Sequence, residues 1–262
     1  MTGPEGVMTL VLAQTMAGSI VLLFCTPLWN EVKRGFFKLT GSIIAALALA
    51  TWATARAACC DGGDGGAAGL VVACAMAIFV ATLVWLVALQ FRRLVAARIV
   101  GMVTVAMAVA LLGFCAATAE EPGALALFQM VAAAAFLGGV LNGLLLGHWY
   151  LTDRGLSRKP INRYANALLV GVGLEAVAVL TMGFEPSAES ATFNPLLTSA
   201  GLSSWIALGM VAATGLIAAL VKATLRGTRA SAVQSATGFF YLAVLTAFTA
   251  GLAAMVGFLP EA

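Results

Sequence analysis

Long apolar stretches alternate with short polar connections along the chain. Each stretch is close to the roughly 20 residues that a helix needs to cross the hydrocarbon core of a bilayer. The stretches are continuously apolar, which favours helices over the alternating strands of a membrane barrel. The pattern predicts an all-α integral membrane protein with eight transmembrane helices, at about Val7–Leu28, Leu39–Ala58, Gly69–Gln90, Ile99–Ala119, Ala124–Gly147, Tyr164–Phe184, Ala200–Val221 and Ala232–Phe258.

Composition supports the same class of protein. The chain is 62% hydrophobic and 10% charged, with a mean hydropathy of +1.03. A soluble domain carries about 25% charged residues, so the lipid bilayer is the expected surroundings. The connections are short, and we therefore expect residues 1–262 to form a single transmembrane domain.

Charge sets the predicted orientation. All but one of the 14 Lys and Arg residues fall in four connections on one side; Arg56 lies opposite, at a helix end from which it can snorkel. Basic residues are retained on the cytoplasmic face, which predicts both termini on the outer side of the cytoplasmic (inner) membrane of a prokaryote. The net charge of +3 then reflects orientation, and no nucleic-acid partner is expected. The four basic groups are Lys33, Arg34, Lys38; Arg92, Arg93, Arg98; Arg154, Arg158, Lys159, Arg163; and Lys222, Arg226, Arg229.

The predicted outer side carries most of the acidic residues. The first six residues contain Glu5 and no Lys or Arg, so we expect a translocated tail rather than a cleavable signal. The longest outer loop, near Glu185–Leu202, is expected either to dock a partner or to cap the bundle. The outer acidic residues are Glu5, Asp61, Asp64, Glu120, Glu121, Glu185, Glu189 and Glu261.

Few residues are suited to bind a metal or cofactor. His148 is the only histidine, which excludes bis-histidine haem ligation within this chain. The cysteines lack Cys-x-x-Cys spacing, so no zinc or iron–sulfur site is expected. Cys59 and Cys60 alone lie on the predicted outer side, where oxidation is possible.

Glu175 is the most informative residue of the sequence. It follows Arg163 by about twelve residues, or about 18 Å of helix, which predicts a position near the bilayer midplane. An ionised carboxyl group facing lipid there is costly, so the side chain should face protein or water. Small residues, Gly171 among them, share its helix face and permit close packing. Two interpretations stay open: a proton relay or ion site, or a protonated acid that hydrogen-bonds between helices.

Other polar residues offer weaker candidates. His148, beside an interfacial Trp-Tyr pair, is either a proton-exchanging group or a solvated interfacial residue. Gln14, Gln129 and Asn142 are expected to bond across helices or to contact a quinone or other ligand. The four-residue spacing of Gly139, Gly143 and Gly147 predicts a close helix crossing.

Two segments resemble a known family. Gln14-Thr15-Met16-Ala17-Gly18-Ser19-Ile20-Val21-Leu22 resembles the Gln- and Gly-containing first helix of the membrane anchor subunit of dimethyl sulfoxide reductase and polysulfide reductase-type molybdoenzymes. Phe136-Leu137-Gly138-Gly139-Val140-Leu141-Asn142-Gly143-Leu144-Leu145 resembles the Gly-Gly-containing fifth helix of such anchors. The resemblance implies a subunit that holds an electron-transfer module at the outer face and exchanges electrons with quinone.

The chain also departs from that family's pattern. Its second predicted helix lacks the histidine that handles quinol protons, and Gly251 is followed by Leu252 where the final helix should carry an acid. Quinone would then bind differently, or the role is lost.

We therefore expect a membrane subunit of a respiratory or related electron-transfer complex, anchoring redox partner subunits and contacting quinone. The chain itself is expected to be a subunit of an oxidoreductase complex rather than a stand-alone enzyme. The alternatives are a proton- or ion-coupled transporter that uses Glu175, and a structural or assembly protein whose polar residues only pack helices.

Overall fold

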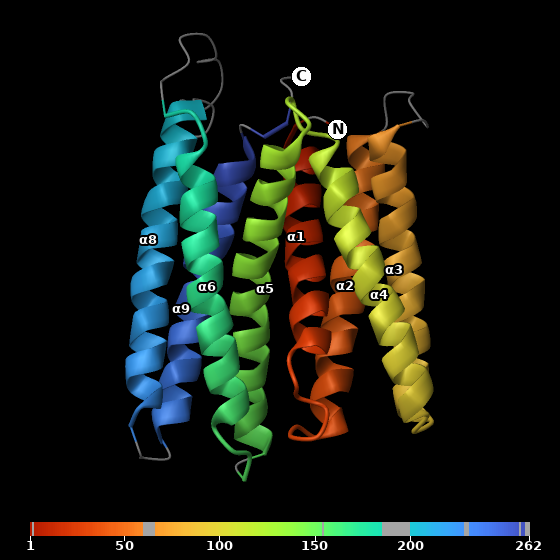
Figure 1. Cartoon of the computed structure of the whole chain (residues 1–262), viewed down its shortest axis with the longest axis vertical. Helices are drawn as coiled ribbons and strands as arrows, with labels where there is room; N and C mark the ends of the chain where they lie inside the picture. Colours follow the sequence, from red (N-terminus) through yellow and green to blue (C-terminus); the bar gives the residue numbers. More distant parts are fainter. Residues whose placement is uncertain are drawn as a thin grey trace.

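The computed structural model describes residues 1, 3–59, 66–153, 155–184, 200–227, 231–256 and 258–259, and these form helices and no strands. Eight helices are long and apolar enough to cross a membrane, which suggests a lipid bilayer around them. Residues 60–65, with Asp61 and Asp64, and most of the loop near Glu185–Leu202 lie outside the described residues. The helices are α1 (Gly3–Cys25), α2 (Arg34–Ala58), α3 (Ala67–Gln90), α4 (Leu94–Ala116), α5 (Ala124–Thr152), α6 (Lys159–Leu180), α8 (Ala200–Leu225) and α9 (Ser231–Val256) (Figure 1).

The helix ends differ from the ends of the apolar stretches. Helix α5 continues to Thr152, five residues beyond the predicted Gly147, and α6 begins at Lys159 rather than at Tyr164. Pro160 lies in the first turn of α6, where its fixed φ suits the start of a helix. The N–H group that proline lacks would have no partner within the helix at this position. Hydropathy marks the thickness of the apolar layer, whereas a helix continues through polar residues for as long as its backbone bonds can form.

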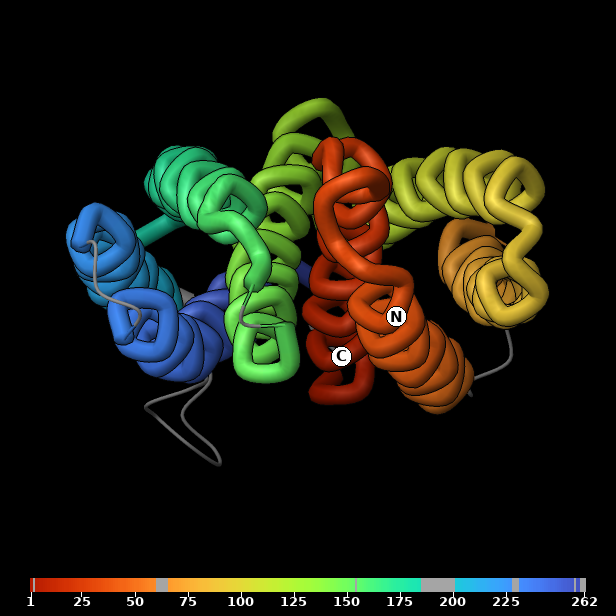
Figure 2. Tube along the Cα trace, turned by 90° about the horizontal axis from the view of Figure 1, so that it is seen from below, coloured from red at the N-terminus to blue at the C-terminus, as the bar shows by residue number. Residues whose placement is uncertain are grey.

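The helices form two four-helix halves that lie side by side. In the first half, α1, α2, α3 and α4 pack in sequence and α4 closes back on α1; in the second, α5, α6, α8 and α9 do the same. Helices α1 and α5 make the main contact between the halves, and Figure 2 shows them in the middle with the other helices to either side. The helix order therefore repeats once along the chain.

The two halves are related by an approximate two-fold rotation about an axis along the helices. Seen along that axis in Figure 2, the helices of each half follow one another in the same rotational sense. Helices α1 and α5 run in the same direction, since Gln14 meets Met130 while Ser19 meets Asn142 further along both helices. The weaker contacts between halves also correspond, α1 with α9 and α4 with α5.

Burial patterns along the helices explain this arrangement. Helix α3 buries a single stripe of residues spaced by four and three positions, from Val71 to Leu89, and leaves the rest partly or fully exposed. That stripe suits a helix at the edge of a bundle in lipid. In contrast, α1 buries every residue from Ala13 to Ile20. A helix that is apolar and buried all around belongs at the centre, which is where α1 lies.

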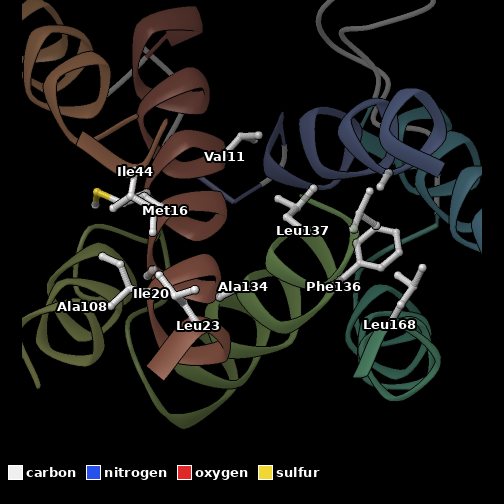
Figure 3. Packing of buried hydrophobic residues seen from close by; sticks show 14 of the residues in the cluster. Val11, Met16, Ile20, Leu23, Ile44, Ala108, Ala134, Phe136, Leu137 and Leu168 are labelled. Carbon is white, nitrogen blue, oxygen red and sulfur yellow. The ribbon is translucent and has the colours of Figure 1, made fainter. Parts of the chain in front are cut away.

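Small residues let the two central helices touch. A Cβ atom added to Gly18 would overlap the carbonyl group of Ala134, and one added to Gly138 would overlap the backbone of Gly18. Direct backbone contact of this kind is typical of helix pairs in membranes, where packing replaces the hydrophobic effect as the driving force. Ile20 and Leu23 of α1 fill the space beside this crossing (Figure 3).

The end of the bundle at which α1 finishes and α2 begins carries the basic connections, and we call it the basic end. Two ion pairs lie there: Lys33 Nζ is 3.1 Å from Asp153 Oδ2, and an Arg163 guanidinium nitrogen is 2.9 Å from Glu31 Oε1. Arg163 also donates to the carbonyl oxygen of Pro27. The α1–α2 connection is thus tied to the second half. The first residue of α1 and the last of α9 lie at the opposite end (Figure 1).

Candidate functional site

Glu175 lies on the packed face of α6. Its neighbours one turn away on that face, Gly171 and Ala178, are buried, and the Glu175 side chain is itself only 2% exposed. Helix α6 packs against α5 and α8, so the carboxyl group lies inside the second half and faces protein rather than lipid. Among the described residues, Glu175 is the only charged side chain that is buried.

Within α6, Glu175 lies nearer the Leu180 end than the Lys159 end. Only five residues separate Glu175 from the end of α6 at Leu180, or about 8 Å of helix. About 24 Å of helix separates it from Lys159. The carboxyl group therefore lies in the half of α6 away from the basic end, and its position near the bilayer midplane stays a prediction.

One oxygen of Glu175 has no hydrogen-bond partner. Oε2 is buried and unpaired, and neither ion pair in the described part of the chain includes this residue. An unpaired polar atom in an apolar interior costs on the order of 1–3 kcal/mol, and more when it is charged. The carboxyl group thus retains capacity to bind a proton or a cation.

Several other polar side chains around α6 and α8 have partners. The Thr214 and Thr246 hydroxyl oxygens lie 2.7 Å apart and join α8 to α9. Near the end of α6, the Gln129 side-chain nitrogen donates to the Thr181 hydroxyl at 3.1 Å. The Tyr164 hydroxyl of α6 is, like Glu175 Oε2, buried without a partner. Of these two groups, Glu175 is the carboxyl group.

His148 lies on the outer surface of the bundle near the basic end. Its side chain is exposed, and its Nδ1 atom lies 3.4 Å from the Tyr241 hydroxyl oxygen. Tyr241 is itself 50% exposed. The pair is therefore far from Glu175 along the bundle, and it faces the surroundings rather than the interior.

Gln14 and Asn142 lie at the junction of the two halves and are fully buried. The Asn142 side-chain nitrogen donates to the Ser19 carbonyl oxygen at 3.0 Å, which ties α5 to α1. The Gln14 side-chain nitrogen points toward two methionine sulfur atoms, of Met130 and Met255. Of the three predicted ligand contacts, Gln129 alone is partly exposed.

The glycines singled out by spacing all lie at helix contacts. A Cβ atom on Gly143 would overlap the Phe240 ring of α9, and one on Gly147 would come within 2.6 Å of the Thr237 hydroxyl oxygen. On the α6 side, a Cβ on Gly139 would lie 3.2 Å from the backbone of Leu168, and one on Gly171 2.8 Å from that of Phe136. Helix α5 thus uses two faces for close contacts.

Sequence reasoning missed an aromatic cluster near the basic end. Trp29 stacks on Phe37 with ring centroids 4.4 Å apart, and Trp85 meets Phe24 edge to face at 5.1 Å. The indole nitrogen of Trp85 is buried without a partner. The space beside it, also lined by Ile20, Ile44 and Thr104, is nowhere wide enough for a water molecule.

Sequence reasoning also overlooked Glu31 and Asp153. Both are acidic residues in connections that otherwise carry basic residues. An acidic residue beside basic ones indicates an ion pair, and this pattern could have predicted the two pairs. The described cysteines, Cys25, Cys59, Cys74 and Cys115, are unpaired thiols, and no group of three His, Cys, Asp or Glu residues in the described part of the chain converges on a metal position.

Comparison of the chain with protein-family models, with curated proteins and with solved structures finds no match. The fold defines the class of protein, a multi-pass helical membrane protein built of two similar four-helix halves.

Proposed function

We propose that this chain is the proton-handling membrane subunit of a respiratory or related electron-transfer complex. Glu175 carries the proposal: it is a buried carboxyl group with an unpaired oxygen in an interior that otherwise lacks charge among the described residues. A group that exchanges a proton inside a membrane protein needs burial and an unfilled hydrogen-bonding site. Glu175 has both, and about 8 Å of helix separates it from the nearer end of α6.

In this proposal the electron carriers belong to partner subunits. The chain has one histidine, and its side chain is exposed, so the chain cannot supply both ligands of a bis-histidine haem. Its own contribution is to anchor those partners, to conduct protons and to meet quinone dissolved in the bilayer. The resemblance of Gln14–Leu22 and Phe136–Leu145 to the anchors of dimethyl sulfoxide reductase-type enzymes supports this assignment.

Exposure narrows the proposed quinone contacts. Gln14 and Asn142 are fully buried at the helix junction, whereas Gln129 is partly exposed and His148 is exposed. A quinone that diffuses in the membrane would reach Gln129 and His148 first. Under the rule that basic residues stay in the cytoplasm, the basic end with His148 lies inside, and Gln129 and both termini lie outside.

The first test is purification in mild detergent from the native membrane. Partner chains that carry haem or iron–sulfur absorption are expected to co-purify in fixed proportion. A chain that purifies alone, stable and without redox partners, would contradict the electron-transfer proposal.

The second test replaces Glu175 in the purified complex. Glu175→Gln keeps the shape and hydrogen bonding of the side chain but cannot exchange a proton. We expect normal assembly and loss of quinone-linked turnover by at least about tenfold, since positioned proton transfer contributes about 10²–10⁴-fold. Glu5→Gln, at an exposed carboxyl group, is the matched control and should keep full turnover. Full activity of Glu175→Gln would remove the proton role and leave a packing residue.

The two-half architecture favours a second candidate, a proton- or ion-coupled transporter. Transporters are commonly built from two similar halves related by an axis along the membrane normal, and the halves of this chain have that relation. If the chain purifies alone, we expect reconstituted vesicles to show uptake driven by a proton or ion gradient. That uptake should be lost in Glu175→Gln.

A further inference from the structure

Three helices, α1, α5 and α9, meet around the middle of α1. Gln14 of α1 is fully buried at this junction. Its side-chain nitrogen, Nε2, lies 3.2 Å from the Met130 sulfur atom of α5 and 3.1 Å from the Met255 sulfur atom of α9. Because both sulfur atoms lie so close to the same nitrogen, they are separated by no more than about twice that distance.

The amide of Gln14 is poorly satisfied in this position. A thioether sulfur is a weak hydrogen-bond acceptor, and the other end of the amide, Oε1, is buried without any partner. Methionine often fills irregular gaps between helices. Gap filling accounts for the two side chains, but it does not account for a buried amide that turns to two sulfur atoms and leaves its oxygen unpaired.

We propose that Gln14, Met130 and Met255 form a binding site for a soft monovalent metal ion, Cu(I) or Ag(I). The terminal torsion of glutamine is soft and two-fold, so a half turn of the amide brings Oε1 to the side of the two sulfur atoms. The three side chains then present two thioether sulfurs and one carbonyl oxygen, one from each helix. Nothing in this inference depends on the electron-transfer proposal.

The donor set selects the class of ion. Thioether sulfur prefers Cu(I) and similar soft ions, whereas Mg²⁺, Ca²⁺ and Mn²⁺ prefer oxygen ligands. All three donors are neutral, and the described charged side chains are not buried except Glu175 on another helix pair. A divalent ion would therefore keep most of its charge uncompensated in an apolar interior. A monovalent soft ion fits best.

The two sulfur ligands lie on the side of the bundle opposite the basic end. Met255 is the residue before the last residue of α9, and Met130 is in the second turn of α5, whereas Gln14 is the middle residue of α1. Thioethers do not pair into disulfides, so they remain available as ligands on an oxidising outer face, where thiols do not.

The test is a titration of the detergent-purified full chain with Cu(I), without oxygen, in competition with a coloured Cu(I) chelator. Accessible thiols are alkylated beforehand, so that cysteine binding is a small background common to all variants. The variants are Met130→Leu with Met255→Leu together, and Met16→Leu as matched control. Met16 is a buried methionine of the same helix as Gln14 that lies toward Ile44 of α2 (Figure 3).

We expect wild type and Met16→Leu to bind one equivalent of Cu(I) more than the double variant. Their thermal midpoints should rise with Cu(I), because an ion that binds only the folded state stabilises it, and the midpoint of the double variant should not rise. Leu conserves the volume of Met well enough to keep the fold, which the midpoint without metal verifies. Equal binding by the double variant overturns the proposal.

A spectroscopic readout on unmutated protein keeps the test independent of folding. In protein labelled with selenomethionine, X-ray absorption at the copper edge should show selenium bound directly to copper. The single variant Met255→Leu should lower the selenium contribution by about half. A copper environment without selenium would overturn the assignment even if copper binds elsewhere on the chain.

Discussion

Gln14, Asn142 and Glu175 are all buried polar side chains, yet their hydrogen-bonding groups meet different partners. The Asn142 nitrogen donates to a carbonyl oxygen at 3.0 Å, although Asn142 Oδ1 has no partner. The Gln14 nitrogen has only two weak sulfur acceptors, and Glu175 Oε2 has no partner. A strong hydrogen bond such as that of the Asn142 nitrogen mainly fixes the position of its helix, whereas a poorly paired group retains free energy of interaction for a ligand or proton. At the residue scale, the strength of the hydrogen bond therefore separates a structural role from a chemical one.

Asn142 allows a test of this separation. Asn142→Leu removes the bond to the Ser19 carbonyl and keeps a similar volume at the junction of the halves. Hydrogen bonds between membrane helices contribute about 0.6 kcal/mol on average and up to about 1.7. We expect the thermal midpoint to fall by a few degrees, with activity per folded molecule unchanged. A loss of activity at unchanged stability would show that Asn142 takes part in the chemistry instead.

At the scale of elements, α5 organises the molecule. It contacts α1 through Gly138, α6 through Gly139 and α9 through Gly143 and Gly147. Three helices thus approach one helix on different faces, and each approach is made where a side chain is missing. This explains how α5, which has few polar residues to direct its packing, nevertheless has defined contacts with three other helices.

The α5–α9 contact yields a prediction. Gly143→Leu places a side chain where the Phe240 ring now lies, and overpacking of this kind costs about 1–3 kcal/mol. Gly173→Leu is the matched control, because a Cβ at Gly173 meets nothing within 4 Å. Thermal unfolding in detergent should show a midpoint lowered by several degrees for Gly143→Leu and little changed for Gly173→Leu. Equal midpoints would mean that the α5–α9 contact adds little stability.

The elements themselves were largely predictable from sequence, and their neighbours were not. Continuous apolar stretches indicate that a helix spans the apolar layer, so eight helices followed from pattern alone. Hydropathy does not show where a helix begins beyond the apolar layer, so the start of α6 at Lys159 was missed. The contact of Gln14 with Met130 and Met255 joins residues 116 and 241 positions apart. No local pattern encodes such a contact.

At the scale of the whole molecule, the two halves have the same helix order but different polar residues. Glu175 lies in α6, and the corresponding helix of the first half, α2, contains no acidic residue. The first half instead packs Trp85 and its aromatic neighbours near the basic end. A repeated scaffold explains the shared helix order, and the difference at α6 assigns the proposed proton chemistry to the second half.

The orientation of the whole molecule in the membrane is predicted from the distribution of its basic residues. The basic connections follow α1, α3, α5 and α8, all at the basic end, and such residues resist transfer across the membrane. A periplasmic reporter fused after Ala262 should therefore be active, and the same reporter fused after Arg229 should be inactive. A cytoplasmic reporter at each site gives the complementary control, which separates true sidedness from poor expression. The reverse pattern would place His148 outside and Gln129 inside. It would also turn the proposed Cu(I) site toward the cytoplasm, where reduced thiols compete for the ion.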